Sequence, residues 1–166
     1  MSLRDILLYP DKRLRKKSIP VKKIDKKILK LLDDLADMTY NAPGVGLAAP
    51  QLGVHIRVIV VDISTKDEEN NLIELINPVI TESSGSQSSE EGCLSVPGFY
   101  GNITRKNSIA VEAQDREGKK FEINADELLS RVLQHEIDHL DGTLFFDRMA
   151  KLKKELFIKK IDKAFK

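Results

Sequence analysis

Hydrophobic residues recur at helical spacing in two parts of the chain. From Ile24–Asp25 onward an apolar stripe predicts a first helix of about 15 residues, with Ile28, Leu31, Leu32, Leu35 and Met38 on its buried side. The helix is expected to stop at residues 41–44, where Pro43 and Gly44 break the periodicity and begin a loop that runs to Gly53. A second stripe predicts another, mostly buried helix, formed by Leu128, Leu129, Val132, Leu133, Ile137 and Leu140.

Both ends of this second helix carry signals in the sequence. Asn124 stands three residues before Glu127, which is the spacing of a capping box. Gly142 stands where a helix would stop. We therefore expect the helix to begin near Asn124 and to end just before Gly142.

Strand-like patterns fill the middle of the chain. Residues 55–62 and 72–80 are rich in Val and Ile, and the polar residues 64–71 between them predict an exposed loop. The Ser/Gly-rich residues 83–89 are expected to be irregular.

The last third of the chain adds a hairpin and a helix. Residues 108–114 and 119–123 flank a plausible turn at 115–118, and a last helix is expected near residues 151–166. Strands in the middle and helices at both ends and behind predict an α+β fold, in which a mainly antiparallel sheet packs against the second helix.

Length and composition narrow the class of protein. The 166 residues suggest one domain spanning 1–166, and the net charge of +1 gives no global argument for nucleic acid, so DNA is not an expected partner. The N-terminus lacks a long apolar run with a cleavage site, and no run of about 18 apolar residues exists. We expect a cytoplasmic protein without a membrane segment. The single cysteine, Cys93, excludes an internal disulfide.

The second helix carries the most informative residues, His135-Glu136-Ile137-Asp138-His139. Histidines four residues apart lie on adjacent turns of one helix face and can chelate one metal ion. Glu136 can then reach a water on the same ion without binding the ion itself. Buried polar groups need partners, so a metal ion would also explain why polar side chains stand on a helix that is expected to be mostly buried. The alternative is an exposed helix that carries two histidines by chance.

A catalytic metal normally has three protein ligands and one open position for water. The candidates for the third ligand are His55, Glu155 and Cys93. His55 opens a strand, and Glu155 lies in a lysine-rich helix that is expected to be exposed. Cys93 follows a glycine that permits close backbone approach. A spectator or a nucleophilic role remains open for Cys93, but beside a metal its thiolate is stabilised, so we favour it as the ligand.

Three segments, in this order, resemble the signature segments of peptide deformylases: residues 44–51 (GVGLAAPQ), 91–95 (EGCLS) and 134–140 (QHEIDHL). Residues 9–15 also resemble the N-terminal segment of that family. Each segment is moderately specific alone, whereas the ordered set is highly specific and spans most of the chain.

The resemblance implies a metal-dependent hydrolase that removes the formyl group from the N-terminal formylmethionine of nascent polypeptides and releases formate. It implies Cys93, His135 and His139 as metal ligands, with an attacking water in the fourth position. It assigns general acid/base catalysis to Glu136, and stabilisation of the oxyanion to the side-chain amide of Gln51 and the backbone N–H of Leu94. The family's usual physiological metal is Fe²⁺, and Zn²⁺, Ni²⁺ or Co²⁺ fit the same ligands.

Several assignments rest on the resemblance and have plainer alternatives. Gln51 could simply tie its loop to the backbone. Gly46 is the candidate for binding the peptide backbone, with Val45 lining the pocket, although Gly46 could be only a turn residue. Leu128 and Val132 are candidates for the methionine pocket, whereas a helical apolar stripe is more often core.

Two acidic residues close to the ligands have a candidate positioning role. Glu91 and Asp138 could orient the ligands or hold a cation such as Arg105. The alternative is a surface ion pair that contributes less than about 1 kcal/mol. Tyr100 stands near a position that is often arginine in bacterial members, which bears on substrate contacts beyond the methionine.

The tail at residues 151–166 contains seven lysines against Glu155 and Asp162. Its approximate apolar side, Leu152, Leu156, Ile158, Ile161 and Phe165, predicts a helix packed on the body with a solvated basic face. The alternative is docking to ribosomal RNA, as the C-terminal helix of some family members suggests.

Two other classes compete with the deformylase hypothesis. A zincin-type peptidase would need a third His or Glu downstream of His139 and would cut unformylated peptides. A non-catalytic protein with a structural metal would need a closed site with four protein ligands, and the sequence offers no persuasive fourth.

Overall fold

The computed structural model describes residues 5–165. The extreme N-terminus, in which the sequence lacks a leader pattern, and Lys166, the expected end of the last helix, lie outside these residues. Within them, no helix is long and apolar enough to cross a membrane.

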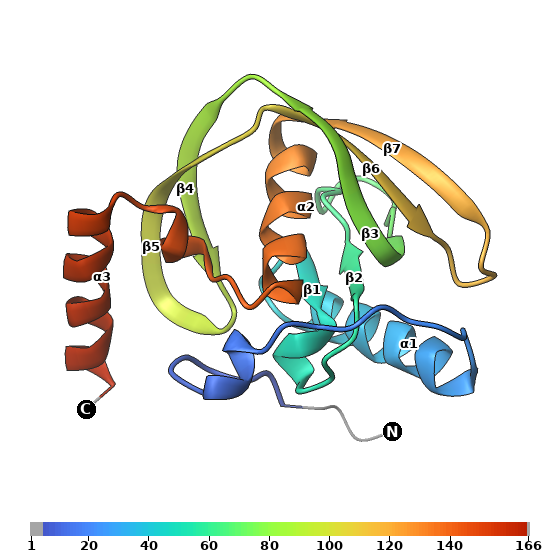
Figure 1. The fold of residues 1–166 in the computed structure, drawn as a ribbon, viewed down its shortest axis with the longest axis horizontal. Coiled ribbons are helices and arrows are strands. Elements are labelled where there is room, and N and C mark those ends of the chain that lie inside the picture. Colours follow the sequence, from blue (N-terminus) through green and yellow to red (C-terminus); the bar gives the residue numbers. More distant parts are fainter. Residues whose placement is uncertain (1–4, 166) are drawn as a thin grey trace.

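A helix at the centre of the molecule, α2 (Glu127–Leu140), is surrounded by two antiparallel sheets (Figure 1). The larger sheet has the strand order β1-β2-β3-β6-β7. Its strands are β1 (Gly46–Ala48), β2 (Val58–Val61), β3 (Ile73–Ser84), β6 (Ser108–Gln114) and β7 (Lys120–Asp126). The smaller sheet pairs β4 (Gln87–Cys93) with β5 (Val96–Arg105). The predicted α+β class and the mainly antiparallel pairing are confirmed.

The first and last helices lie on the outside of this arrangement. α1 (Lys26–Asn41) begins at Asp25, whose carboxylate caps the N–H groups of Lys27 and Ile28, and it ends before Pro43 as predicted. The C-terminal α3 (Lys151–Ala164) lies beside the β4–β5 sheet at the edge of the molecule (Figure 1). Three short 3-10 helices complete the order: η1 (Lys12–Arg15), η2 (Ala49–Leu52) and η3 (Phe145–Arg148).

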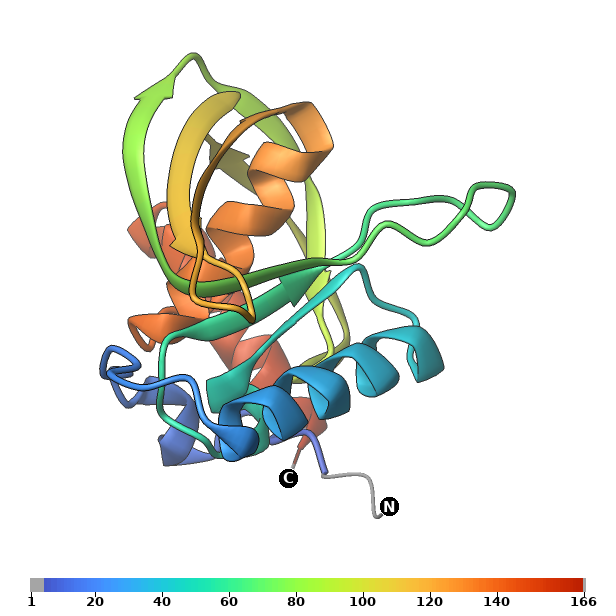
Figure 2. The same cartoon turned by 90° about the vertical axis from the view of Figure 1, so that its right-hand side faces the viewer.

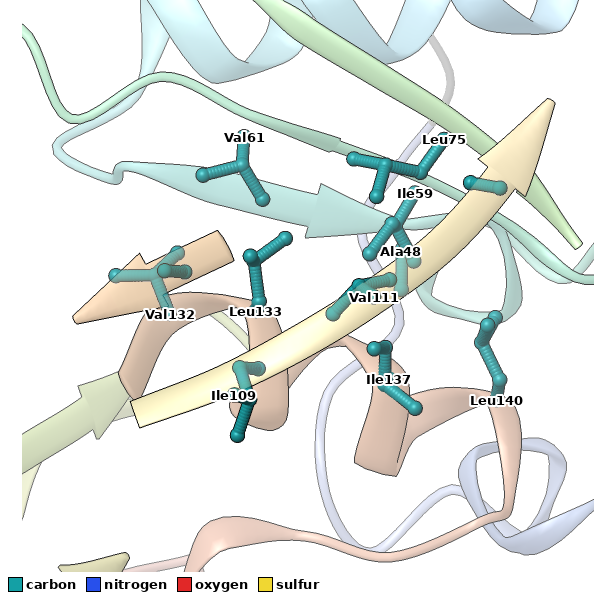
Figure 3. Close-up of a cluster of buried hydrophobic side chains, with 12 residues drawn as sticks. Ala48, Ile59, Val61, Leu75, Ile109, Val111, Val132, Leu133, Ile137 and Leu140 are labelled. Atoms are coloured by element: carbon teal, nitrogen blue, oxygen red, sulfur yellow. The ribbon is translucent and has the colours of Figure 1, made fainter. Parts of the chain in front are cut away.

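Apolar side chains of the larger sheet meet α2 in the main core (Figure 3). Leu133 and Ile137 project from the helix toward Ile59, Val61 and Val111 of the sheet. A second cluster fills the space between α1 and the strands β1 and β2. Since each fully buried aliphatic side chain contributes about 1.5–3 kcal/mol, the first cluster holds α2 on the sheet and the second holds α1 on it.

The loops between strands differ partly from expectation. The polar residues 64–71 form an exposed loop as predicted, and Figure 2 shows it extending away from the body. Residues 83–89 are not irregular: β3 runs to Ser84, and β4 begins at Gln87 after a turn in which Gly85 has φ 68°. Pairing across strands overrides the weak strand propensity of serine, as the 2.7 Å hydrogen bond between Ser88 and Thr104 shows.

The start of α2 also differs from expectation. Asn124 lies inside β7, and the residue that precedes the helix is Asp126, so the predicted capping box is wrong. Leu128 is 51% exposed rather than buried. The predicted end at Gly142 is confirmed, because its N–H donates to the carbonyl of His139 at a φ of 73°.

Candidate active site

The three predicted metal ligands lie together although they come from two distant segments. His135 and His139 stand on adjacent turns of α2, and Cys93 ends β4. One ligand atom of each residue lies within 4.8 Å of the others, and Cys93 Sγ is 3.4 Å from His139 Nε2. A thiolate with two imidazoles is a donor set for Zn²⁺ or Fe²⁺, so the residues fit a divalent metal.

A buried ion-pair network fixes the orientation of His135. Its Nδ1–H donates to Glu91 Oε1 at 2.9 Å, which turns Nε2 toward the other ligands. Glu91 also accepts from Arg105 Nε at 2.6 Å and from Arg131 Nη1. Arg105 in turn donates to Asp138 Oδ2 at 2.9 Å. Glu91 and Asp138 are therefore buried partners of Arg105 and not members of a surface ion pair.

The two histidines have pKa values that are shifted in opposite directions. Burial lowers the pKa of His135, but hydrogen bonds to Cys93 and Glu91 outweigh it, and the pKa is raised well above its usual value. Burial and the positive charge of His135 lower the pKa of His139 well below its usual value. The cluster thus favours positive charge between the thiol and the carboxylates, and a divalent cation there would supply it.

Glu136 lies beside the cluster, next to His135 on α2. It is 4% exposed, and its Oε1 has no hydrogen-bond partner among residues 5–165. Burial raises the pKa of this carboxyl from 4.5 to about 7. Such a value suits a group that accepts and returns a proton near neutral pH.

The backbone of β1 presses against Glu136 at Gly46. A Cβ at this position would lie 2.9 Å from Glu136 Oε2 and 3.1 Å from the carbonyl oxygen of Val60. Only glycine therefore fits at Gly46 without displacing the carboxylate.

Gln51 faces the cluster from η2. Its Oε1 accepts from the N–H of Ala48 at 3.0 Å, which fixes the amide. Its Nε2 donates to Ser95 Oγ at 3.0 Å and lies 3.6 Å from Cys93 Sγ. Leu94 follows Cys93 in the turn between β4 and β5. The side-chain amide of Gln51 and the peptide group between Cys93 and Leu94 therefore lie next to the sulfur of Cys93.

A cavity of about 400 Å³ lies beside these groups. Its lining includes the ligands Cys93 and His135 together with Glu136 and Gln51, and also Gly46 and Leu94. The four predicted substrate-binding residues all line it: Val45, Gly46, Leu128 and Val132. Tyr100 lines it too, packed so closely on Gly92 that a Cβ there would lie 2.5 Å from the ring.

Comparison with known proteins agrees with this geometry. Residues 3–155 match the model of the family described as polypeptide deformylase. The chain belongs to the peptide deformylase family. The hydrolase class expected from the sequence is therefore confirmed, as is metal-dependent removal of the formyl group from an N-terminal methionine, with Cys93, His135 and His139 as the candidate metal site.

Peptide deformylases from several organisms match this chain over almost its whole length. The peptide deformylase of Thermodesulfovibrio yellowstonii is 51% identical over 160 residues, covering 96% of this chain and 97% of the relative. That of Syntrophobacter fumaroxidans is 46% identical and covers 100% and 98%. The crystal structure of the Legionella pneumophila deformylase has a TM-score of 0.89 at 47% identity, covering 98% and 95%. The Ehrlichia chaffeensis deformylase in complex with actinonin has a TM-score of 0.90 at 41% identity, covering 99% and 98%.

The rejected candidates for the third ligand lie elsewhere in this deformylase fold. His55 Nε2–H donates to the carbonyl of Arg13 at 2.8 Å, and Glu155 is exposed on α3. Within the described residues 5–165, the zincin alternative thus lacks a downstream ligand in the cluster. Among residues 5–165, the metal-ligand cluster contains three members and no fourth, which does not favour a closed structural site.

Sequence reasoning missed the part played by Arg131. Its guanidinium donates to Glu91 and to the carbonyls of Gln87 and Ile103, and thereby ties α2 to both strands of the smaller sheet. The available signal was a charged residue inside the apolar stripe of α2, directly before Val132.

Proposed function

We propose that this member of the deformylase family removes the formyl group from an N-terminal formylmethionine through Cys93, His135 and His139 as metal ligands and Glu136 as general acid/base. The observation that carries this assignment is the thiolate and imidazole donor set beside a buried carboxylate, one oxygen of which has no partner in the described part of the chain. The donor set suits Fe²⁺ as the physiological metal, with Zn²⁺, Ni²⁺ or Co²⁺ as substitutes. We also propose that residues 1–166 form one catalytic domain.

Glu136 handles the proton in this proposal. A divalent cation held by the three ligands would lower the pKa of water from ~15.7 to about 7 and so supply a nucleophile. Glu136 accepts the proton of that nucleophile and returns it to the departing amine. Its pKa of about 7 supports both transfers, because a much stronger acid would not take the proton and a much weaker acid would not release it.

Gln51 and Leu94 stabilise the negative charge that forms on the formyl oxygen. The Gln51 amide is held by Ala48 and Ser95, so its Nε2–H₂ group is preorganised next to the cluster. The backbone N–H of Leu94 is the second proposed donor. Removal of one such donor typically costs about 3 kcal/mol of transition-state stabilisation.

The free edge of β1 is the proposed site for the peptide backbone. The N–H of Asp62 donates to the carbonyl of Val45, and Leu47 pairs with Val60. This antiparallel alternation turns the N–H and C=O of Gly46 away from β2, toward the outer edge of the sheet. An extended substrate can add there as a strand while Val45, Leu128 and Val132 form the apolar pocket for methionine.

Formate release tests the assignment directly. Anaerobically prepared, iron-loaded protein is expected to liberate formate from formyl-Met-Ala and to leave unformylated peptides intact. Cleavage of internal bonds in an unformylated peptide, without formate release from formyl-Met-Ala, would show that the zincin hypothesis is correct instead.

A second part of the proposal concerns where the substrate is met. On α3, Leu152 and Leu156 are 69% and 58% exposed, so the predicted packing of these two residues on the body is wrong, whereas Ile161 is buried. Exposed leucines between lysines support docking of α3 to the ribosome in the cytoplasm, where nascent formylated peptides emerge. Sedimentation with ribosomes at rising salt tests this, since contacts with RNA phosphates weaken as salt increases. An affinity that does not change with salt would contradict it.

A further inference from the structure

A second cavity, of about 270 Å³, lies between the β3–β4 turn, the end of β5 and α2. It shares no lining residue with the cavity at the metal ligands. Its charged lining residues are Arg105, Lys106, Asp138 and Arg148. Three cationic side chains therefore surround this cavity against one carboxylate.

The carboxylate is already occupied by arginines. Asp138 Oδ2 accepts from Arg105 Nη1 at 2.9 Å and from Arg148 Nε at 3.1 Å, and Oδ1 accepts from Arg148 Nη2 at 2.6 Å. Arg105 also donates to Glu91 through Nε and Nη2. Within residues 5–165, no acidic side chain forms an ion pair with Lys106, and Nη1 of Arg148 has no hydrogen-bond acceptor. Lys106 and Nη1 of Arg148 thus leave positively charged donors available at this cavity.

These donors are attached to rigid parts of the fold. Gln134 Oε1 accepts from the N–H of Lys106 at 3.1 Å, and Gln134 Nε2 donates to the carbonyl of Lys106 at 2.8 Å. Ser130 Oγ donates to the same carbonyl at 3.0 Å. Two hydrogen bonds to Asp138 hold the guanidinium of Arg148. Such preorganisation lowers the entropy cost of binding a ligand.

The β3–β4 turn limits the cavity on its outer side. At Gly85, a Cβ would lie 3.2 Å from the Cβ of Asn107, so the turn passes close to the segment that carries Lys106. Ser86 of this turn lines the cavity as well. A small polar ligand is therefore enclosed on several sides and meets hydroxyl as well as cationic groups.

We propose that this cavity binds an oxyanion of the phosphate class, supplied either as free phosphate or by the backbone of an RNA chain. Arginine presents its N–H groups in a planar fork that suits phosphate oxygens, and lysine adds a point charge. Arg148 contributes Nη1 and Lys106 contributes Nζ, while Asp138 keeps the fork of Arg148 in place. This site goes beyond deformylation, because none of the proposed catalytic groups lines it.

Calorimetric titration with inorganic phosphate tests the site in the metal-loaded protein. We expect saturable binding that Lys106→Gln weakens about tenfold, the effect of losing one charge-assisted hydrogen bond. Arg148→Gln should weaken it at least as much. The matched control is Lys120→Gln, which removes an exposed lysine on β7 outside this cavity and should leave the affinity unchanged.

Formate release separates this proposal from the deformylase assignment. Lys106→Gln should keep the activity of the unchanged protein on formyl-Met-Ala, so loss of phosphate binding is not loss of the fold or of the metal. Phosphate that binds at the metal would be insensitive to Lys106→Gln. Absence of saturable binding, or equal affinity in the Lys106→Gln and Lys120→Gln proteins, would overturn the proposal.

A short single-stranded RNA distinguishes the two sources of the anion. If RNA binds, is displaced by phosphate and is weakened by Lys106→Gln, the ligand is a phosphate of the RNA backbone. If Lys106→Gln weakens phosphate but not RNA, the ligand is free phosphate. Both outcomes support the site and differ only in its source.

Discussion

Glu91 and Glu136 are both buried carboxylates next to His135, yet their environments are opposite. Glu91 is 7% exposed and accepts hydrogen bonds from His135, Arg105 and Arg131. Burial alone would raise its pKa, but hydrogen bonds from His135 and Arg105 lower it to about 2. Glu136 has the same burial without such donors, and its pKa rises to about 7.

Hydrogen-bond donors, rather than depth of burial, therefore decide the pKa of these two buried carboxyl groups. With its charge compensated by two arginines, Glu91 remains ionised and serves to orient His135. Glu136 retains an oxygen without a partner among residues 5–165 and lines the cavity next to the ligands, where it can exchange a proton. The carboxylate of Glu91 on β4 is thus fully paired, whereas that of Glu136 on α2 has an oxygen without a partner among residues 5–165 and lines the cavity.

The largest effect is expected from Glu136→Gln. If this residue carries the proton, the turnover number should fall by about 10²–10⁴-fold while the metal stays bound. Formate release and metal analysis of the purified variant measure the two quantities. An equal loss of metal would mean that Glu136 is a metal ligand and not the group that carries the proton.

Gln51→Glu should have the next largest effect. The new side chain keeps an oxygen to accept from the N–H of Ala48 but loses the donor aimed at the cluster. We expect kcat to fall about 10²-fold with a smaller change in KM, because the donor acts mainly on charge that develops in the transition state. A change confined to KM would assign Gln51 to binding or to loop structure.

Glu91→Gln tests the fully paired carboxylate on β4. It leaves Arg105 and Arg131 without their shared carboxylate, so the free energy of unfolding should fall by about 3–5 kcal/mol. Because the charged hydrogen-bond partner that orients His135 is lost, metal affinity should also fall by about 10–100-fold. Chemical denaturation and competition with a chelator measure these effects.

The neighbouring Glu90 provides the matched control for Glu91. It is an exposed carboxylate on the same strand, so Glu90→Gln should change stability by no more than about 0.5 kcal/mol. Similar losses in the two variants would mean that the ion-pair network does not distinguish Glu91.

The sequence predicted the local parts of this site better than the long-range parts. His135 and His139 follow from helical spacing, and α1 and its boundaries follow from the apolar stripe. The ordered segments identified Cys93 and Gln51 through the family resemblance. The contacts of Arg131 with β4 and β5 could not be predicted, because they depend on how two strands fold over α2. The β3–β4 hairpin was missed for the same reason, since pairing partners stabilise its serines.

The smallest expected effect distinguishes a pocket residue from a core residue on α2, the helix that carries Glu136. Leu128 is 51% exposed and lines the cavity, whereas Val132, one turn later, is 6% exposed and also packs in the core with Leu133. Leu128→Ala should therefore leave stability within about 0.5 kcal/mol and raise KM for formylmethionyl peptides about fivefold, since about 1 kcal/mol of apolar contact with the substrate is lost from this half-exposed side chain. Val132→Ala should lower stability by about 1 kcal/mol as well, because it leaves a cavity in the core. Thermal unfolding and steady-state kinetics of the two variants measure this, and a destabilised Leu128→Ala protein with unchanged KM would place Leu128 in the core instead of the methionine pocket.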